Sequence, residues 1–137
     1  MNLTRVAVAA VAAWVAFLLV GTFVDTVMMD GLSSRRPGLG PDAAVGLVLA
    51  LLGFLAFAYT YAKGYEGGQG PIEGLRFGVL VALMLVSFAV AWTHVAPVAP
   101  SRAVGLALDY IVEFAAYGTL VGAIYKPSSR RAGRGTA

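Results

Sequence analysis

The sequence predicts an all-α polytopic membrane protein whose four transmembrane helices form an antiparallel bundle, with both termini in the cytoplasm. Of its 137 residues, 59% are hydrophobic and only 12% are charged. Water-soluble domains carry about 25% charged residues, so this chain has too few to cover a surface that faces water. Four long apolar segments, separated by charged or Gly- and Pro-rich breaks, are the candidate helices.

Each apolar segment is long enough for a helix that crosses a membrane. A hydrocarbon core about 30 Å thick requires roughly 20 helical residues. Lipid offers the backbone no hydrogen bonds, and these segments lack the alternation of barrel strands, so we expect helices. They cover about residues 6–24, 43–62, 77–96 and 103–125 of a transmembrane domain formed by residues 1–127. Residues 128–137 are predicted to be a basic, flexible cytoplasmic tail.

The first apolar segment has features of a secretory signal peptide, because one arginine precedes a long apolar run. However, the run exceeds the roughly 7–15 residues of a signal-peptide core, and no small-residue cleavage site follows it. We therefore interpret this segment as a retained first helix.

The orientation is predicted from the distribution of lysine and arginine. One side of the membrane carries seven of these residues: Arg5, Lys63, Arg76, Lys126, Arg130, Arg131 and Arg134. The other side carries three: Arg35, Arg36 and Arg102. The excess places both termini in the cytoplasm, as in a multi-pass protein of the bacterial inner membrane. The four basic residues after residue 125 either bind lipid headgroups or only enforce this orientation.

Two carboxylates inside the fourth apolar segment, Asp109 and Glu113, are the leading candidates for a functional site. Their i, i+4 spacing places both on one helix face, which Tyr117 continues by another turn. Ionisable groups inside a membrane are costly and suggest a function by default. Three interpretations are open. The acids pass a proton or cation, they pair with a basic or hydroxyl group of another helix or chain, or they are protonated and hydrogen-bonded within the bundle.

Few other polar groups are placed to join this acidic pair. His94 lies near the outer end of the third segment, and Asp25 marks the outer end of the first. An outward-facing polar cluster of Asp25, His94 and Asp109 is geometrically feasible, and the alternative is that His94 is a wetted interfacial residue. Ligand spacings typical of a metal site are missing, so we predict no metal.

Small residues with a spacing of four form a second feature. The helix-packing candidates are Gly118, Gly122, Ala9, Ala13, Ala12 and Ala16. Such pairs let membrane helices approach closely. At about 100° per residue, the two glycines lie roughly opposite the acidic pair, so the fourth helix presents two different faces. Each face meets either a neighbouring helix of the same chain or another subunit.

The glycine-rich break at residues 63–76 has no features of a phosphate-binding loop. It lacks the GxxxxGK[ST] pattern, a preceding strand and a lysine placed for a phosphate. We predict a flexible interhelical loop. Glu73 and Arg76 are spaced i, i+3 at the start of the third helix, which favours a local ion pair.

Several functional classes are excluded by composition. The chain has no cysteine, which rules out disulfides, thiolate metal sites, iron–sulfur clusters and cysteine catalysis. No paired nucleophile and base is recognisable, so we predict no enzyme activity and no cofactor. The basic excess is small and has no interleaved aromatic residues, which argues against a nucleic-acid partner.

Three short motifs resemble those of small bacterial four-helix integral membrane proteins of uncharacterised function. They are Glu73-Gly74-Leu75-Arg76-Phe77-Gly78, the ending Gly122-Ala123-Ile124-Tyr125-Lys126-Pro127, and Tyr61-Ala62-Lys63-Gly64-Tyr65-Glu66 before the third helix. The resemblance covers the membrane region but not the tail. It implies a four-helix membrane protein and brings no activity or catalytic residues.

Three functions are compatible with these features. The leading prediction is a non-catalytic subunit or assembly module that packs against other membrane chains within the lipid bilayer. The second is a small oligomeric transporter or channel, coupled to protons or cations through Asp109 and Glu113. The third is a membrane enzyme acting on a lipid or quinone with Glu113 or His94 as acid or base. The expected partners are other membrane subunits or further copies of the chain.

Overall fold

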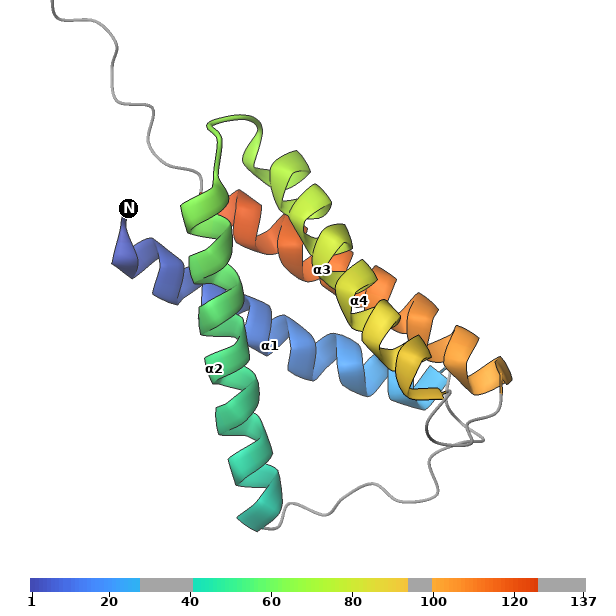
Figure 1. Cartoon of the computed structure of the whole chain (residues 1–137). Coiled ribbons are helices and arrows are strands. Elements are labelled where there is room, and N and C mark those ends of the chain that lie inside the picture. The colour runs from blue at the N-terminus through green and yellow to red at the C-terminus, as the bar shows by residue number, and fades with distance from the viewer. Residues whose placement is uncertain (28–40, 94–99, 126–137) are drawn as a thin grey trace, which may run out of the picture.

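Four α-helices make up the part of the chain that the computed structural model describes, residues 1–27, 41–93 and 100–125. They are α1 (Leu3–Val27), α2 (Pro41–Gly64), α3 (Gly70–Thr93) and α4 (Pro100–Tyr125) (Figure 1). Each is long and apolar enough to cross a membrane, and the described ranges contain no strand. The prediction of an all-α membrane protein with four spanning helices is confirmed.

The helices extend beyond the apolar segments from which they were predicted. α3 begins at Gly70 instead of residue 77, and α4 begins at Pro100 instead of residue 103. α1 and α2 are likewise longer than predicted at both ends. The flexible loop predicted over residues 63–76 is wrong for most of its length, because only residues 65–69 connect α2 to α3.

Local capping explains where α1 and α3 begin. The Asn2 side-chain oxygen accepts a hydrogen bond of 3.2 Å from the Arg5 N–H, which is typical of a helix N-cap. At the start of α3, the Gln69 carbonyl accepts hydrogen bonds from two N–H groups of the first turn, at 2.9 and 3.0 Å. Pro71 suits that first turn, since a proline lacks the N–H that would have no partner there.

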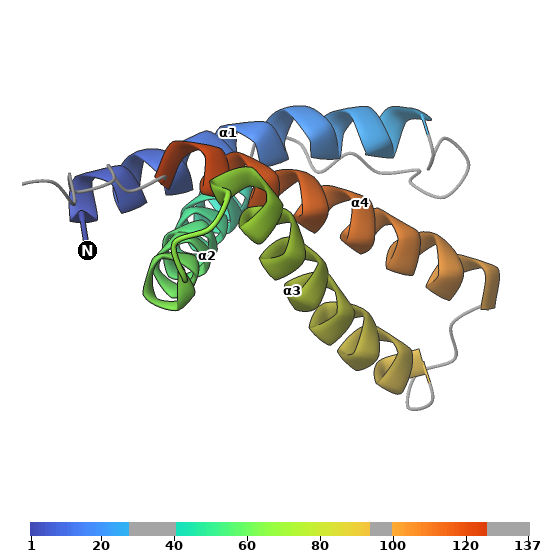
Figure 2. The same ribbon diagram turned by 90° about the horizontal axis from the view of Figure 1, so that it is seen from above.

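α3 and α4 form an antiparallel hairpin in which glycines of one helix face the backbone of the other (Figure 2). A Cβ atom added at Gly74 would lie 2.8 Å from the Gly118 carbonyl carbon. One added at Gly78 would lie 2.8 Å from the Phe114 carbonyl carbon. Only residues without a side chain permit this approach. The α3 residues on this face recur every four positions: Gly70, Gly74, Gly78 and Ala82.

The buried core lies toward one end of the molecule. Its members are Val6, Ala9, Ala10, Ala13, Phe54, Phe57, Ala58, Tyr61, Tyr117, Val121 and Tyr125. They come from the first half of α1 and from the second halves of α2 and α4. At this end the helices gather, whereas their opposite ends spread apart (Figures 1 and 2). The four helices therefore form a fan, closed at one end, instead of an evenly packed bundle.

α2 packs against α1 and diverges from α3 along most of its length (Figure 1). The Trp14 indole N–H of α1 donates a hydrogen bond of 3.1 Å to the Leu47 carbonyl oxygen of α2. This contact joins the middle of α1 to the first half of α2. The divergence of α2 from α3 leaves the space in which the candidate site lies.

Candidate functional site

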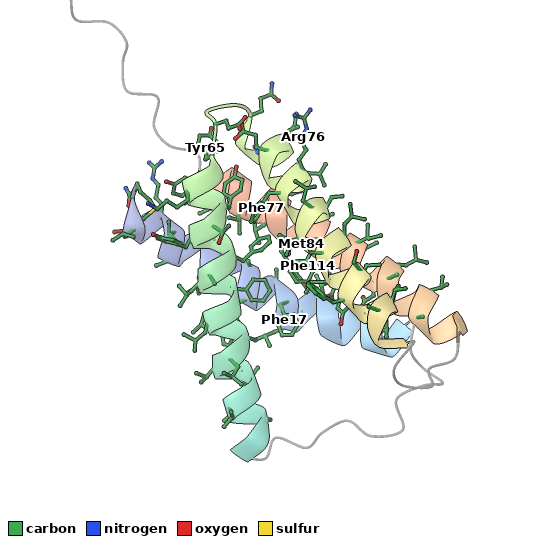
Figure 3. The ribbon with its side chains drawn as sticks, viewed as in Figure 1. Phe17, Tyr65, Arg76, Phe77, Met84 and Phe114 are labelled. Atoms are coloured by element: carbon green, nitrogen blue, oxygen red, sulfur yellow. The ribbon has the colours of Figure 1, made fainter. Side chains whose placement is uncertain are left out.

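A cleft of about 650 Å³ opens where α2 and α3 diverge, and we call it the α2–α3 cleft. It is lined by Phe17, Ala50, Gly53, Phe54, Ala56, Phe57, Thr60, Phe77, Val81, Met84, Leu85, Tyr110, Glu113, Phe114 and Tyr117. Figure 3 shows Phe17, Phe77, Met84 and Phe114 lying around this space. All four helices contribute to the wall. In a membrane, the open side between α2 and α3 would face lipid.

Aromatic side chains make up much of this wall. Rings within contact distance connect Phe17, Phe54, Phe57, Tyr61, Tyr65, Phe77, Tyr110, Phe114, Tyr117 and Tyr125 in one aromatic cluster. Phe54 and Tyr117 meet edge to face, with ring centroids 5.2 Å apart. The centroids of Phe57 and Phe77, from α2 and α3, are 4.9 Å apart. Such pairs each contribute about 0.5–1.5 kcal/mol beyond burial, so the wall is firmly held.

Glu113 is the acid that lines the α2–α3 cleft. It lies near the middle of α4 and is only 7% exposed. The same cleft is lined by Phe17 of α1, Phe54 of α2 and Phe114 of α4. A buried carboxyl group therefore shares its cleft with aromatic rings, in the middle of a candidate transmembrane helix.

The Tyr117 hydroxyl is buried beside Glu113, one turn further along α4. Tyr117 is 1% exposed, and its hydroxyl interacts electrostatically with the Glu113 and Asp109 carboxyls. A phenolic hydroxyl that faces a carboxyl group still has oxygen lone pairs that can accept a hydrogen bond. The cleft wall therefore offers a second polar group beside Glu113.

The two predicted acids do not share one environment. Asp109 lies one turn before Glu113 and is half-buried, but it is not among the residues that line the cleft. Of the residues that do line it, the titratable ones are Tyr110, Glu113 and Tyr117, all from α4. The acidic pair is therefore divided between a cleft residue and a residue beside the cleft.

Two acidic side chains lie deepest in the described helices among the Asp, Glu, Lys and Arg residues. Among the described side chains of residues 1–20, 43–91 and 103–125, Asp109 and Glu113 lie more than two turns from either end of their helix. The described basic residues Arg5, Lys63 and Arg76 all lie closer to helix ends. The same ranges contain no group of three or more His, Cys, Asp or Glu residues able to hold a metal ion.

A smaller pocket of about 200 Å³ lies at the turn between α2 and α3. There the Glu73 carboxylate accepts a hydrogen bond of 2.6 Å from the Gly68 N–H. The Tyr65 hydroxyl donates one of 2.8 Å to the Gly68 carbonyl. The predicted ion pair of Glu73 with Arg76 is wrong. No described acidic residue forms a salt bridge with Arg76, because the Glu73 side chain turns back toward the loop and bonds it instead.

The predicted small residues lie at helix contacts within the chain. Gly118 and Gly122 face the glycine row of α3. Ala9 and Ala13 are fully buried in the core, whereas Ala12 and Ala16 are half-buried. The Asp25 side chain, His94, Lys126, Arg130, Arg131 and Arg134 lie outside the described residues.

Two features of the site were not recognised in the sequence. One is the aromatic face of α4, where Tyr110, Phe114 and Tyr117 recur at helical spacing around Glu113. The other is the glycine row of α3, of which Gly70 and Gly74 were assigned to a loop. A search for i, i+4 and i, i+7 spacing of aromatic and glycine residues across the predicted loop boundary would have found both.

Comparison of this chain with protein-family models, with curated proteins and with solved structures found no match. The architecture is that of a multi-pass membrane protein, with four candidate transmembrane helices and an aromatic-walled cleft between α2 and α3 that carries one carboxyl group.

Proposed function

We propose that this protein is a small membrane transporter that binds either a cation or a proton at Glu113 in the α2–α3 cleft. The supporting observation is that a mid-membrane carboxyl group, only 7% exposed, lines a cleft of about 650 Å³. An acid on an apolar wall in a membrane is costly, and such residues mark substrate and ion pathways. This favours the transporter over the assembly module that was the leading prediction.

Competition at one carboxyl group would couple the two species. A proton and a cation both neutralise Glu113, so each excludes the other, and release of one accompanies uptake of the other. Transport also requires the cleft to face each side of the membrane in turn. α2 is the element suited to this movement, because it packs on α1 and contacts α3 only near the closed end of the fan.

The transporter proposal is tested by flux measurements on protein reconstituted into liposomes. We expect the double variant Asp109→Asn, Glu113→Gln to abolish cation flux driven by a pH gradient. Glu113→Gln alone should have the same effect, since Asp109 does not line the cleft. Glu66→Gln is the matched control, because Glu66 is exposed in the turn after α2. Unchanged flux in the double variant would exclude both acids as the coupling groups.

A second candidate function, an assembly module, is supported by the face of α2. A Cβ atom added at Gly46 or Gly53 would meet nothing within 4 Å. With Ala50 between them, these residues form a small-residue row of the kind that packs transmembrane helices. A partner chain or a further copy of this chain would fit that face. Native mass after gentle detergent extraction separates the cases: co-purified membrane subunits support assembly, and a monomer contradicts it.

The orientation and location are also proposals. We infer that both termini lie in the cytoplasm of a bacterial cell and that the chain resides in its inner membrane. The support is the count of seven lysine and arginine residues on one side against three on the other. In that orientation the closed end of the fan faces the cytoplasm.

A further inference from the structure

We propose that the substrate of the α2–α3 cleft is a lipophilic organic cation with an N–H group, that is, a protonated amine attached to an apolar body. This inference deepens the proposed transport function and rests on it. It is carried by four properties of the cleft: its size and opening, its charge, its aromatic wall and the Tyr117 hydroxyl.

The size and opening of the cleft favour a ligand that dissolves in lipid. Its volume of about 650 Å³ falls within the range of roughly 300–1,000 Å³ typical of sites for drug-sized molecules. It opens between α2 and α3, which diverge, and the α3 side chains that line it are apolar. One of them, Met84, is 60% exposed. A ligand entering here passes from the bilayer, so it needs an apolar body.

The charge of the cleft selects the sign of the ligand. Its wall carries one carboxyl group, that of Glu113, and no basic residue. In a medium of low dielectric constant an opposite charge is strongly attracted, whereas an anion would be repelled. A bare metal ion would need several oxygen ligands, and the described residues contain no cluster that supplies them.

The aromatic wall suits an organic cation better than an inorganic one. Phe54, Phe57, Phe114 and Tyr117 line the same cleft as Glu113. The centroids of Phe57 and Phe114 are 5.8 Å apart, and those of Phe114 and Tyr117 are 5.7 Å apart. The faces of aromatic rings attract a cationic nitrogen, and the same rings pack against the apolar part of the ligand.

The Tyr117 hydroxyl supplies selectivity for an N–H group. Tyr117 is 1% exposed, its hydroxyl lies beside the Glu113 carboxyl, and its side chain lines the cleft. A protonated amine would donate its N–H hydrogen bond to the Tyr117 oxygen, while the nearby Glu113 carboxylate attracts its charge. A quaternary ammonium has no N–H to donate and would leave the hydroxyl as it is. The site should therefore prefer the protonated amine among cations of equal charge and size.

Equilibrium binding to protein in nanodiscs tests the inference, with protein-free nanodiscs correcting for partition into lipid. The probes are three fluorescent compounds of one scaffold: dimethyl(naphthylmethyl)amine, the trimethyl(naphthylmethyl)ammonium ion and uncharged isobutylnaphthalene. We expect the amine to bind most tightly and the uncharged compound to bind at least about tenfold more weakly than the amine. Equal binding of the charged and uncharged probes by the unmodified protein would overturn the proposal, whatever the variants do.

Variants assign the recognition to particular groups. Glu113→Gln should weaken both cations about tenfold or more, and Glu66→Gln should change neither. Tyr117→Phe should weaken the amine about threefold to tenfold and leave the quaternary ion unchanged, because only the amine uses the hydroxyl. Equal loss of both cations in Tyr117→Phe would contradict the selectivity.

The binding and flux measurements test the substrate class and the transport function independently. Amine binding that depends on Glu113, without flux in liposomes, would retain the ligand class and exclude transport. Proton-coupled flux of an inorganic cation that depends on Glu113, without amine binding, would retain transport and exclude this substrate class.

Discussion

Tyr61 shows how a single side chain joins three helices at the closed end of the fan. It is 3% exposed, and its hydroxyl donates a hydrogen bond of 3.0 Å to the carbonyl of Gly70, the first residue of α3. Its ring also meets that of Tyr125 at the end of α4, with centroids 6.1 Å apart. Tyr61 therefore links α2 to the start of α3 and to the end of α4.

We expect Tyr61→Phe to lower the free energy of unfolding by about 1 kcal/mol, because the ring contacts stay and the hydrogen bond is lost. Unfolding in mixed detergent micelles, followed by circular dichroism, measures this change. Tyr59→Phe removes a hydroxyl from a ring that is 44% exposed and is the matched control, with no expected change. Equal stability of the two variants would show that the hydrogen bond contributes nothing.

The candidate site was only partly predictable at the residue scale. The i, i+4 spacing of Glu113 and Tyr117 placed them on one face of one helix, and the structure has them side by side. The rings opposite them, Phe17 and Phe54, come from α1 and α2. Which residues of different helices meet depends on crossing angles and depth, which spacing within one helix does not contain. The separation of Asp109 from the cleft was unpredictable for the same reason.

At the scale of elements, the contact between α3 and α4 depends on glycine. A Cβ at Gly74 would lie 3.0 Å from the Gly122 Cα and closer still to the Gly118 carbonyl group. These atoms belong to a helix backbone, which cannot turn aside as a flexible side chain would. Any side chain at Gly74 therefore forces the two helices apart.

We expect Gly74→Ala to destabilise the protein by about 1–3 kcal/mol, the usual cost of overpacking. Gly53→Ala on α2 is the matched control, since a Cβ there meets nothing within 4 Å. The control should be neutral or slightly stabilising, because alanine favours the helix by up to about 1 kcal/mol over glycine. Thermal unfolding in detergent compares the two, and similar effects would contradict the tight contact.

The start of α3 could not be predicted from local signals. In water-soluble proteins a run such as Gly67-Gly68-Gln69-Gly70-Pro71 marks a loop, and the first part of it does form the turn. Gly67 has a φ of 96°, which suits glycine. The later glycines instead serve contact between helices in a membrane. Glycine is thus typical both of a turn and of a close helix–helix contact, and the partner helix distinguishes the two.

At the scale of the whole molecule, the absence of cysteine offers a direct test of orientation. Single-cysteine variants Glu66→Cys and Ser34→Cys report the breaks after the second and first helices. We expect a membrane-impermeant maleimide added to intact spheroplasts to label Ser34→Cys and not Glu66→Cys. A permeant maleimide should label both and controls for reactivity. The reverse pattern would place the termini outside.

The number of helices and their ability to span a membrane followed from composition and segment length alone. The fan shape did not. In lipid, apolar side chains are no longer forced together, so hydrophobicity does not specify which helices pack. Close contacts arise instead where small residues or rings complement one another, as in the α3–α4 hairpin and the aromatic cluster. α2 meets α3 through the Phe57–Phe77 ring contact near the closed end, and the two helices diverge along most of their length.

The fan has a mechanical consequence for the surrounding lipid. A body that is narrow at one membrane surface and wide at the other occupies unequal areas in the two leaflets. Moving α2 toward α3 would return area to the leaflet at the wide end and leave the narrow end nearly unchanged. Lateral pressure in that one leaflet therefore acts on the width of the protein. Because the size of the lipid headgroups sets this pressure, it shifts the equilibrium between the two positions of α2.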